Sequence, residues 1–194
     1  MRSLTLLGAV TGVALFAGIR LYATVLTVGL CLRYGLLSLP PELSSLAVLS
    51  HPYVLAAAGV CAAAEFLADK IPWVDSLWDA VHVFVRPAGA ALIAFAAVGS
   101  LDPAAEVAVI LLCGGIAFSS HATKAGARLA VNQSPEPFSN VLLSLVEDAV
   151  AVGGSYTAIA HPLAILAVVA VFLLLFFLLA RRLFRRLRAK SPPG

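Results

Sequence analysis

The run from Ala158 to Ala180 contains no Asp, Glu, Lys or Arg, and it is long enough to cross a lipid bilayer as one helix. Over the whole 194-residue chain, hydrophobic residues make up 61% and charged residues only 12%. An average soluble domain has about 45–50% apolar and about 25% charged residues. So little charge cannot cover so much apolar surface in water. The composition therefore indicates an integral membrane protein, and it argues against a soluble enzyme, a nucleic-acid-binding protein and a disordered regulator.

Apolar stretches divide the chain into six segments, at residues 4–32, 53–69, 87–101, 104–130, 138–153 and 158–180. The first and the fourth are longer than the about 20 residues that one upright span needs, so we expect each to be tilted or broken. Breaks would fall near Ala17–Gly18 and Ser119–Ser120. The predicted fold class is an all-α integral membrane protein, a compact bundle of about six transmembrane helices in a single domain at residues 1–180.

The tail at residues 181–194 holds six of the 13 basic residues, namely Arg181, Arg182, Arg185, Arg186, Arg188 and Lys190. A basic segment directly after an apolar run marks the cytoplasmic side of a membrane, and it also attracts anionic lipid headgroups. With an even number of spans, both termini are predicted to be cytoplasmic, and only Arg33 disagrees with this orientation. No nucleic-acid-binding fold accompanies the tail. The partner that we expect is therefore the lipid bilayer and not nucleic acid, while a homo-oligomer is left open.

The two halves of the chain, residues 4–101 and 104–180, resemble each other weakly. Glu65 in the second stretch has a counterpart in Glu147 in the fifth, and short glycine-containing segments of the first and fourth stretches are similar. Three spans per half would make the halves an inverted repeat with broken or re-entrant segments, a common plan of secondary transporters. Chance similarity between short apolar segments explains the pattern equally well, so both interpretations stay open.

Ionisable residues inside or at the edge of the apolar stretches are the most informative feature for function. They are Arg20, Glu65, Asp69, Lys124, Arg128, Glu147 and Asp148. Each charged side chain at the centre of a membrane helix costs about 2.5–3.5 kcal/mol even on the lenient insertion scale. Such residues must pair with one another, face a water-filled cavity or lie at the membrane interface.

A basic stripe follows Ser119–Ser120. At 100° per residue, helical geometry places His121, Lys124 and Arg128 within about 60° of one another. Alanine and glycine surround these three residues, and small residues let helices approach closely in lipid. We expect this basic stripe to pair with acidic groups in the interior of the protein.

A mainly acidic stripe lies in residues 73–86. The spacings i, i+4, i+7 and i+11 align Asp75, Asp79, His82 and Arg86 on one helical face. One interpretation is an amphipathic helix on the membrane surface, with its polar face solvated. Surface helices usually carry Lys and Arg on that face, so a re-entrant or cavity-lining element is the other interpretation. The sequence leaves both open.

Metal-dependent chemistry is the competing interpretation of the acids. Glu65, Asp69, Asp75, Asp79 and His82 would supply enough oxygen and nitrogen ligands for a divalent cation. The sequence has no serine elbow, HExxH or P-loop, and its three cysteines have no metal-ligand spacing. We therefore assign no catalytic residue and predict no cofactor, a divalent cation being left open, and we regard an enzyme as the less favoured class.

Several segments together resemble a known family. They are the pattern from Glu65 through Asp79 and His82 to Arg86-Pro87, and the segments Gly18–Arg20, His121–Arg128 and Ser134–Asn140. From about Gly12 to Pro162, the chain is similar to an uncharacterised bacterial integral membrane family, domain of unknown function 4126. The resemblance implies a multi-pass protein of the bacterial inner membrane, and it implies no activity.

We predict a small transporter or channel-like membrane protein with a charged central site and an unknown substrate. The candidate residues of the substrate or ion site are Arg20, Glu65, Asp69, Asp75, Asp79, His82, His121, Lys124, Arg128, Glu147 and Asp148. The basic residues Arg20, Lys124 and Arg128 would balance the acids across the interface between the two halves. The alternatives are a metal-dependent membrane enzyme that acts on a lipid headgroup, and a structural membrane subunit.

Overall fold

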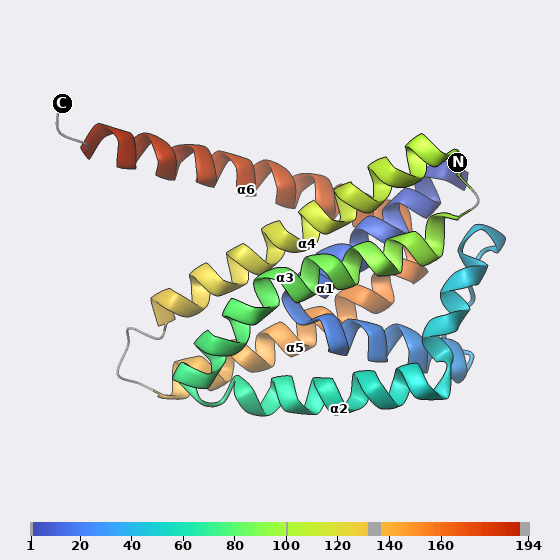
Figure 1. Cartoon of the computed structure of the whole chain (residues 1–194), viewed down its shortest axis with the longest axis horizontal. Helices are drawn as coiled ribbons and strands as arrows, with labels where there is room; N and C mark the ends of the chain where they lie inside the picture. The colour runs from blue at the N-terminus through green and yellow to red at the C-terminus, as the bar shows by residue number, and fades with distance from the viewer. Residues whose placement is uncertain (1, 100, 132–136, 191–194) are drawn as a thin grey trace.

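The computed structural model describes residues 2–99, 101–131 and 137–190, and it is helical throughout (Figure 1). The elements are α1 (Arg2–Arg33), the 3-10 helix η1 (Pro41–Ser50), α2 (Pro52–Ala68), α3 (Pro72–Val98), α4 (Pro103–Val131), α5 (Pro137–Ala160) and α6 (Pro162–Lys190). Every element after α1 begins at a proline, whose fixed φ and missing N–H suit the first position of a helix. Part of one segment of the family resemblance, residues 134–136, lies outside the described residues, as do residues 191–194 of the tail.

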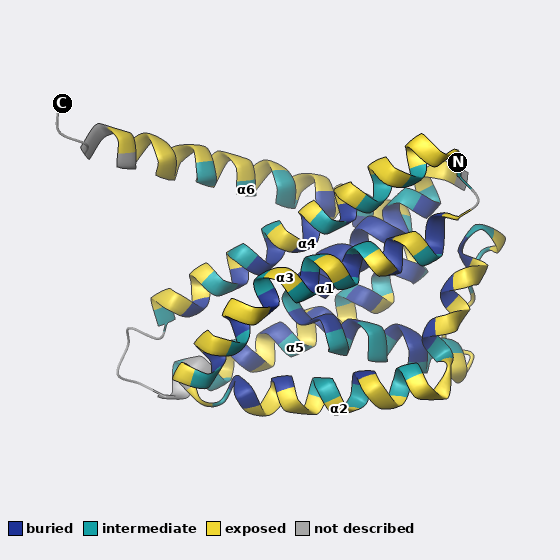
Figure 2. Cartoon of the chain, viewed as in Figure 1, coloured by how far each residue is buried: buried dark blue, intermediate teal, exposed yellow. Residues whose placement is uncertain are grey.

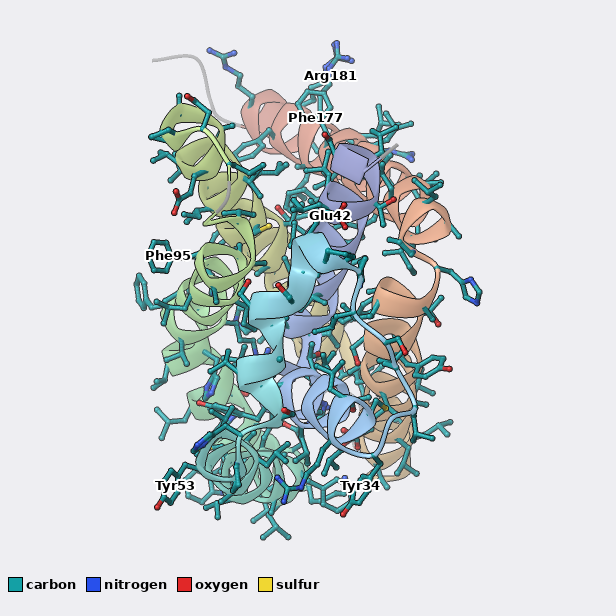
Figure 3. The ribbon with its side chains drawn as sticks, turned by 90° about the vertical axis from the view of Figure 1, so that its right-hand side faces the viewer. Tyr34, Glu42, Tyr53, Phe95, Phe177 and Arg181 are labelled. Carbon is teal, nitrogen blue, oxygen red and sulfur yellow. The ribbon has the colours of Figure 1, made fainter. Side chains whose placement is uncertain are left out.

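The described helices confirm the membrane-protein fold class. Five of them are long and apolar enough to span a bilayer, and a sixth span results if η1 and α2, bent by 65°, are counted as one. Large apolar side chains cover the outside of the bundle, and Phe95 and Phe177 project outward from it (Figure 3). The outer parts of α2, α3, α4 and α6 are exposed, whereas most of α1 is buried (Figure 2). This distribution is the one expected of a protein whose outer surface meets lipid.

Helix α1 is broken in the interior at Arg20, which has the non-helical dihedral angles φ −147° and ψ 87°. The two halves of α1 meet at this break, and both ends of α1 lie at the same end of the bundle (Figures 1 and 3). The break falls two residues after the Ala17–Gly18 position that the sequence indicates. The other predicted break, at Ser119–Ser120, is wrong, because α4 runs as one continuous helix through these residues.

The two ends of the chain lie at opposite ends of the bundle (Figure 1). Helices α2 to α6 run alternately along the long axis, and α1 returns to the end at which it began. The prediction that both termini are cytoplasmic stays a prediction.

Residues 73–86 are not a surface helix. They form the first half of α3, which continues without interruption through Pro87 to Val98. All four side chains of the acidic stripe are buried, with 6% exposure or less. A solvated polar face would require the opposite, so the cavity-lining interpretation is the correct one.

Close packing around α1 depends on glycine. A Cβ atom at Gly18 would collide with the Ala117 carbonyl oxygen and with Ser120 Oγ of α4. A Cβ atom at Gly8 would collide with the Pro162 carbonyl oxygen at the start of α6. Small residues thus bring the backbone of α1 against its neighbours, as is common between membrane helices. The division of the chain into repeats 4–101 and 104–180 stays a prediction.

Candidate functional site

A buried network of charged side chains occupies the interior where α1 breaks. It joins ten of the eleven predicted site residues through ion pairs and hydrogen bonds, and His82 lies beside it. The network has two parts. We call Asp69, Asp75, Glu147 and Asp148, with Arg20 and Arg128, the acid-rich cluster. We call Glu65 and Asp79, with Arg86, Lys124 and His121, the balanced cluster.

Arg20 binds the acid-rich cluster from the break in α1. Its guanidinium forms an ion pair with Asp69, and its Nε lies 3.1 Å from Asp148 Oδ1. Its Nη2 lies 3.5 Å from Glu147 Oε2 and donates hydrogen bonds to the Ser144 carbonyl and hydroxyl oxygens at 3.1 and 3.0 Å. Arg20 therefore connects the turn after α2 with one face of α5. An arginine can do this because its five N–H donors point in several directions.

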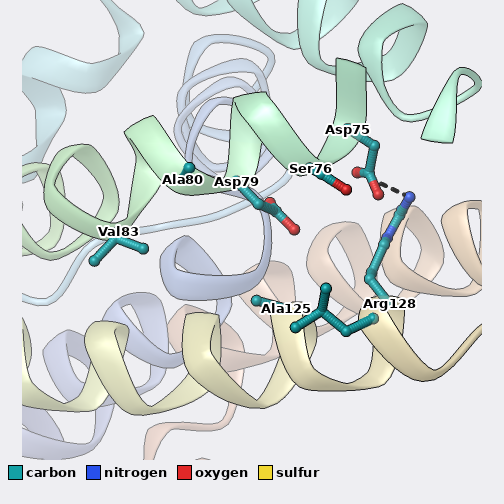
Figure 4. Close-up of a pocket in the computed structure, with 8 residues that line it drawn as sticks. Asp75, Ser76, Asp79, Ala80, Val83, Ala125 and Arg128 are labelled. Carbon is teal, nitrogen blue, oxygen red and sulfur yellow. Dashed lines mark ion pairs between the residues drawn. The ribbon is translucent and has the colours of Figure 1, made fainter. Parts of the chain in front are cut away.

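Arg128 holds three carboxylates with one guanidinium. Its Nη2 lies 2.5 Å from Glu147 Oε2, and its Nε donates to Glu147 Oε1 at 3.1 Å, which is a bidentate pair. The same Nη2 lies 3.3 Å from Asp69 Oδ2, and Nη1 lies 3.0 Å from Asp75 Oδ1 (Figure 4). Bidentate arginine–carboxylate pairs are the strong form of this interaction. Arg128 thus ties α4 to α3, to α5 and to the turn after α2.

Asp69 directly follows α2, as its C-terminal cap, and its side chain is fully buried. Burial alone would raise the pKa of Asp69, but Lys124, Arg20 and Arg128 together hold the pKa below its ordinary value. The carboxyl group of Asp69 is therefore ionised.

The balanced cluster is organised by Arg86. Its Nη2 lies 2.6 Å from Glu65 Oε1, and its Nη1 lies 3.3 Å from Asp79 Oδ1. The same Nη1 donates to His121 Nδ1 at 2.5 Å, so this ring nitrogen carries no proton. His121 Nε2 must then carry the proton and donate it to the Asp79 carbonyl oxygen at 3.0 Å. His121 is therefore a neutral imidazole that orients Arg86.

His82 lies at the edge of the network. Its Nδ1 donates to the Trp78 carbonyl oxygen at 2.8 Å, because a carbonyl can only accept. Its Nε2 lies 3.2 Å from the Tyr22 hydroxyl, which donates to this nitrogen when the ring is neutral, and the ring stacks on Trp78 with 4.6 Å between centroids. His82 is accordingly packed between two aromatic rings, those of Tyr22 and Trp78.

Lys124 connects the two clusters. Its Nζ lies 3.5 Å from Asp79 Oδ1 on α3 and 3.6 Å from Glu147 Oε2 on α5. Each of these carboxylates lines a different cavity. Asp79 lines a partly open cavity of about 200 Å³ between α3 and α4, together with Asp75 and Arg128 (Figure 4).

The second cavity measures about 340 Å³ and lies among α1, α4, α5 and α6. Its polar side is formed by Lys124, Glu147, Ser120 and Thr123, and its walls are apolar. We call the first cavity the α3–α4 cavity and the second the α1–α6 cavity. The charged network therefore lies between two cavities, and Lys124 reaches a carboxylate of each.

Each acid of this network contacts at least one basic side chain. Within the described residues there is no group of three or more His, Cys, Asp or Glu side chains that could hold a metal ion. The geometry therefore offers the divalent-cation interpretation no preformed site in the described part of the chain.

Three members of the site are not among the candidate residues that the sequence indicates. Arg86 was aligned with the acidic stripe but was not among the site candidates, although its spacing already placed it on the buried face. Ser144 lies three and four residues before Glu147 and Asp148, a helical spacing that could have found it. Lys70 donates to Ser144 Oγ at 2.9 Å, and only the folded chain brings these two residues together.

Comparison with known proteins gives a family and no individual relative. The model of the family described as "Domain of unknown function (DUF4126)" matches residues 7–182, which is most of the chain. Neither the curated proteins nor the solved structures contain a match to this chain.

Proposed function

We propose a function from the site itself, because the chain belongs to the family DUF4126 and the description of that family assigns no activity. We infer that the protein is a small multi-pass transporter or channel-like protein for an ion or a small charged solute. One observation carries the proposal. A continuous ion-paired network separates two cavities, and the single Lys124 ammonium contacts a carboxylate from each.

Charges at membrane depth support a pathway. Ionisable side chains inside membrane proteins are costly, and they mark ion paths, proton relays and substrate sites. Arg20, Arg86 and Arg128 are each about 1% exposed or less. A purely structural bundle could replace such pairs with apolar side chains at little cost or with a gain in stability.

The break in α1 supports the same proposal. Secondary transporters build their sites from discontinuous helices, because unwound backbone can then face the substrate or ion. Arg20 stands at such a discontinuity and contacts acids that belong to the turn after α2 and to α5.

A structural membrane subunit requires only that the charges be paired, and it requires no cavities beside them. A metal-dependent enzyme requires clustered ligands, whereas the described acids face guanidinium and ammonium groups. The two cavities thus favour the transporter over both alternatives.

For localisation we propose the inner membrane of a bacterium, with the end of the bundle that carries Lys70 and the basic end of α6 in the cytoplasm. The excess of arginine after Ala180 favours this orientation under the positive-inside rule. The N-terminus would then face the opposite compartment. A reporter fused to each terminus tests this orientation, and signals from the same compartment would contradict it.

Flux through the purified full-length protein tests the proposed function. The protein is reconstituted in liposomes, and flux is followed under imposed gradients of H⁺, Na⁺, K⁺ or Cl⁻. We expect gradient-dependent flux, and we expect Lys124→Gln to abolish or uncouple it because Asp79 and Glu147 lose their shared counterion.

Asp102→Asn is the matched control, because Asp102 is exposed and an asparagine still accepts the hydrogen bond from the Ala104 N–H. It should leave flux unchanged. If folded protein carried no flux under any of these gradients, the structural-subunit function would replace the transporter.

A further inference from the structure

The two clusters differ in their balance of charge. In the balanced cluster, two acids face two bases. In the acid-rich cluster, four acids surround two arginines, and the half-buried Lys70 at its edge still leaves more acids than bases. An uncompensated buried charge costs several kcal/mol, and the usual escape is that the group becomes neutral.

Asp75 is the acid whose negative charge is least stabilised by neighbouring groups. Its side chain is buried, and its ion pair among the described residues is with Arg128 Nη1 at 3.0 Å. That guanidinium is already shared with Asp69 and with the bidentate Glu147. Neither oxygen of Asp75 accepts a hydrogen bond from an N–H or hydroxyl group of the described residues. A buried carboxylate is normally stabilised by several such donors.

Asp75 and Asp69 share one guanidinium, because Arg128 Nη1 lies 3.0 Å from Asp75 Oδ1 and Arg128 Nη2 lies 3.3 Å from Asp69 Oδ2. Two ionised carboxylates repel, and neither can donate to the other. One added proton converts the repulsion into a hydrogen bond, as in other carboxyl pairs that share a site. Asp69 is held ionised by Arg20 and Arg128, so the proton belongs on Asp75.

We propose that Asp75 is protonated and donates to Asp69, and that this pair is the proton-binding site of the protein. Its further role, as the carrier of the coupling proton, rests on the proposed transport function. The proton has a route, because Asp75 and Ser76 line the α3–α4 cavity (Figure 4). On release, the proton passes from Asp75 to water in that cavity, and Asp75 becomes a carboxylate.

Release changes the surroundings of Arg128. The new charge on Asp75 competes with Glu147 for the Arg128 guanidinium, and Glu147 lines the α1–α6 cavity. Protonation at one cavity is thereby linked to the ion pairs that face the other.

The charged groups around Asp75 come from every neighbouring element: Arg20 of α1, Asp69 and Lys70 of the turn after α2, Asp79 of α3, Lys124 and Arg128 of α4, and Glu147 and Asp148 of α5.

Infrared spectroscopy of the full-length protein in lipid nanodiscs tests the proton directly and without a gradient. We expect the carbonyl stretching band of a protonated carboxylic acid at neutral pH, and we expect Asp75→Asn to remove it. Because asparagine resembles a neutral aspartic acid in shape, this variant should fold and keep its thermal midpoint.

Asp79→Asn is the matched control, one helical turn further along α3 and in the same cavity. It should keep the band and lower the thermal midpoint, because it removes a charge that Arg86 and Lys124 share. Absence of the band in the unaltered protein would overturn the proposal, and so would its persistence in Asp75→Asn. A rise in the thermal midpoint of the unaltered protein with added Na⁺, but not with added protons, would also overturn it, in favour of a bound cation.

These readings are independent of transport. A band that depends on Asp75 in a protein without proton flux would leave the proton-binding site standing and remove the proposed function. Proton flux that survives in Asp75→Asn would leave the proposed transport function standing and would remove Asp75 as the carrier of the coupling proton.

Discussion

The acid-rich cluster and the balanced cluster both join acidic and basic side chains in the interior of the protein, yet they differ in how completely each charge is matched. In the balanced cluster, Arg86 and Lys124 face Glu65 and Asp79, and His121 fixes the orientation of Arg86. In the acid-rich cluster, Arg20 and Arg128 are each shared among three carboxylates. A cluster with matched charges keeps its protonation state, whereas a cluster with excess acid can bind and release a proton. The comparison therefore separates a structural region of the network from a responsive one.

Loss of a shared arginine should have the largest effect. Arg128→Ala leaves Asp69 and Glu147 without their common counterion, and breaking a buried pair in this way costs about 3–5 kcal/mol of unfolding free energy. The double variant Arg128→Ala/Glu147→Ala should lose less than the sum of the two single variants. Denaturant unfolding in detergent measures the three values. Strict additivity would mean that Arg128 and Glu147 do not depend on each other.

Arg33→Ala is the control for the first prediction. Arg33 bonds the Ser50 carbonyl oxygen at 3.4 Å at the surface of the bundle, outside both clusters. Its removal should change stability little, because exposed interactions of this kind contribute about 0–1 kcal/mol.

Neutralising one acid in each cluster should give an intermediate and unequal effect. Glu65→Gln removes the charged acceptor of Arg86, and hydrogen bonds to charged groups contribute about 1.5–3 kcal/mol. Asp75→Asn should change stability little if Asp75 is already neutral. Thermal or denaturant unfolding of the two variants side by side decides this. Equal losses would mean that the two clusters are matched alike.

Acid should weaken the acid-rich cluster through Asp69. The pKa of Asp69 is lowered in the folded protein, so its contribution is complete above the unfolded value of about 3.9. Stability is then lost as the pH falls through the lower, folded pKa. Asp69→Asn should flatten this acid limb in a pH series of unfolding measurements, and it should lower stability at neutral pH. The exposed Asp102→Asn should leave the limb in place, and an unchanged limb in Asp69→Asn would contradict the assignment.

Composition and apolar runs were enough to predict the helical membrane class. That the buried charges have partners could also be predicted, because burial of Glu65 or Arg128 in lipid is too costly without them. Partner choice could not be predicted, since Arg86 meets Glu65 and His121 only after α2, α3 and α4 have packed. A break in α1 was predicted near Gly18, but the fold-back at Arg20 was missed, because no proline stands near Arg20 and Gly18 itself marks the contact with α4.

Helix boundaries were more predictable than the hydropathy stretches indicated. Prolines at 52, 72, 103, 137 and 162 each begin a helix, and position 72 shows that residues 73–86 open α3. The apolar stretch that begins at residue 87 covers only the second half of α3, because the first half carries Asp75, Asp79 and Arg86. A proline inside a helix usually ends or kinks it, and Pro87 stands at that position. In α3 it does not interrupt the helix, which runs from Pro72 to Val98.

The smallest expected effect concerns His82, which borders the balanced cluster without an ion pair among the described residues. Tyr22→Phe removes the hydroxyl that donates to His82 Nε2, and one neutral hydrogen bond contributes about 0.5–1.5 kcal/mol. Because His82 keeps its bond to the Trp78 carbonyl oxygen and its stacking on Trp78, the ring should stay in place. Unfolding measurements give the loss, and Tyr53→Phe at an exposed position serves as the control. A loss as large as that of Glu65→Gln would mean that Tyr22 and His82 belong to the charged network, and the boundary of the balanced cluster would move outward to include α1.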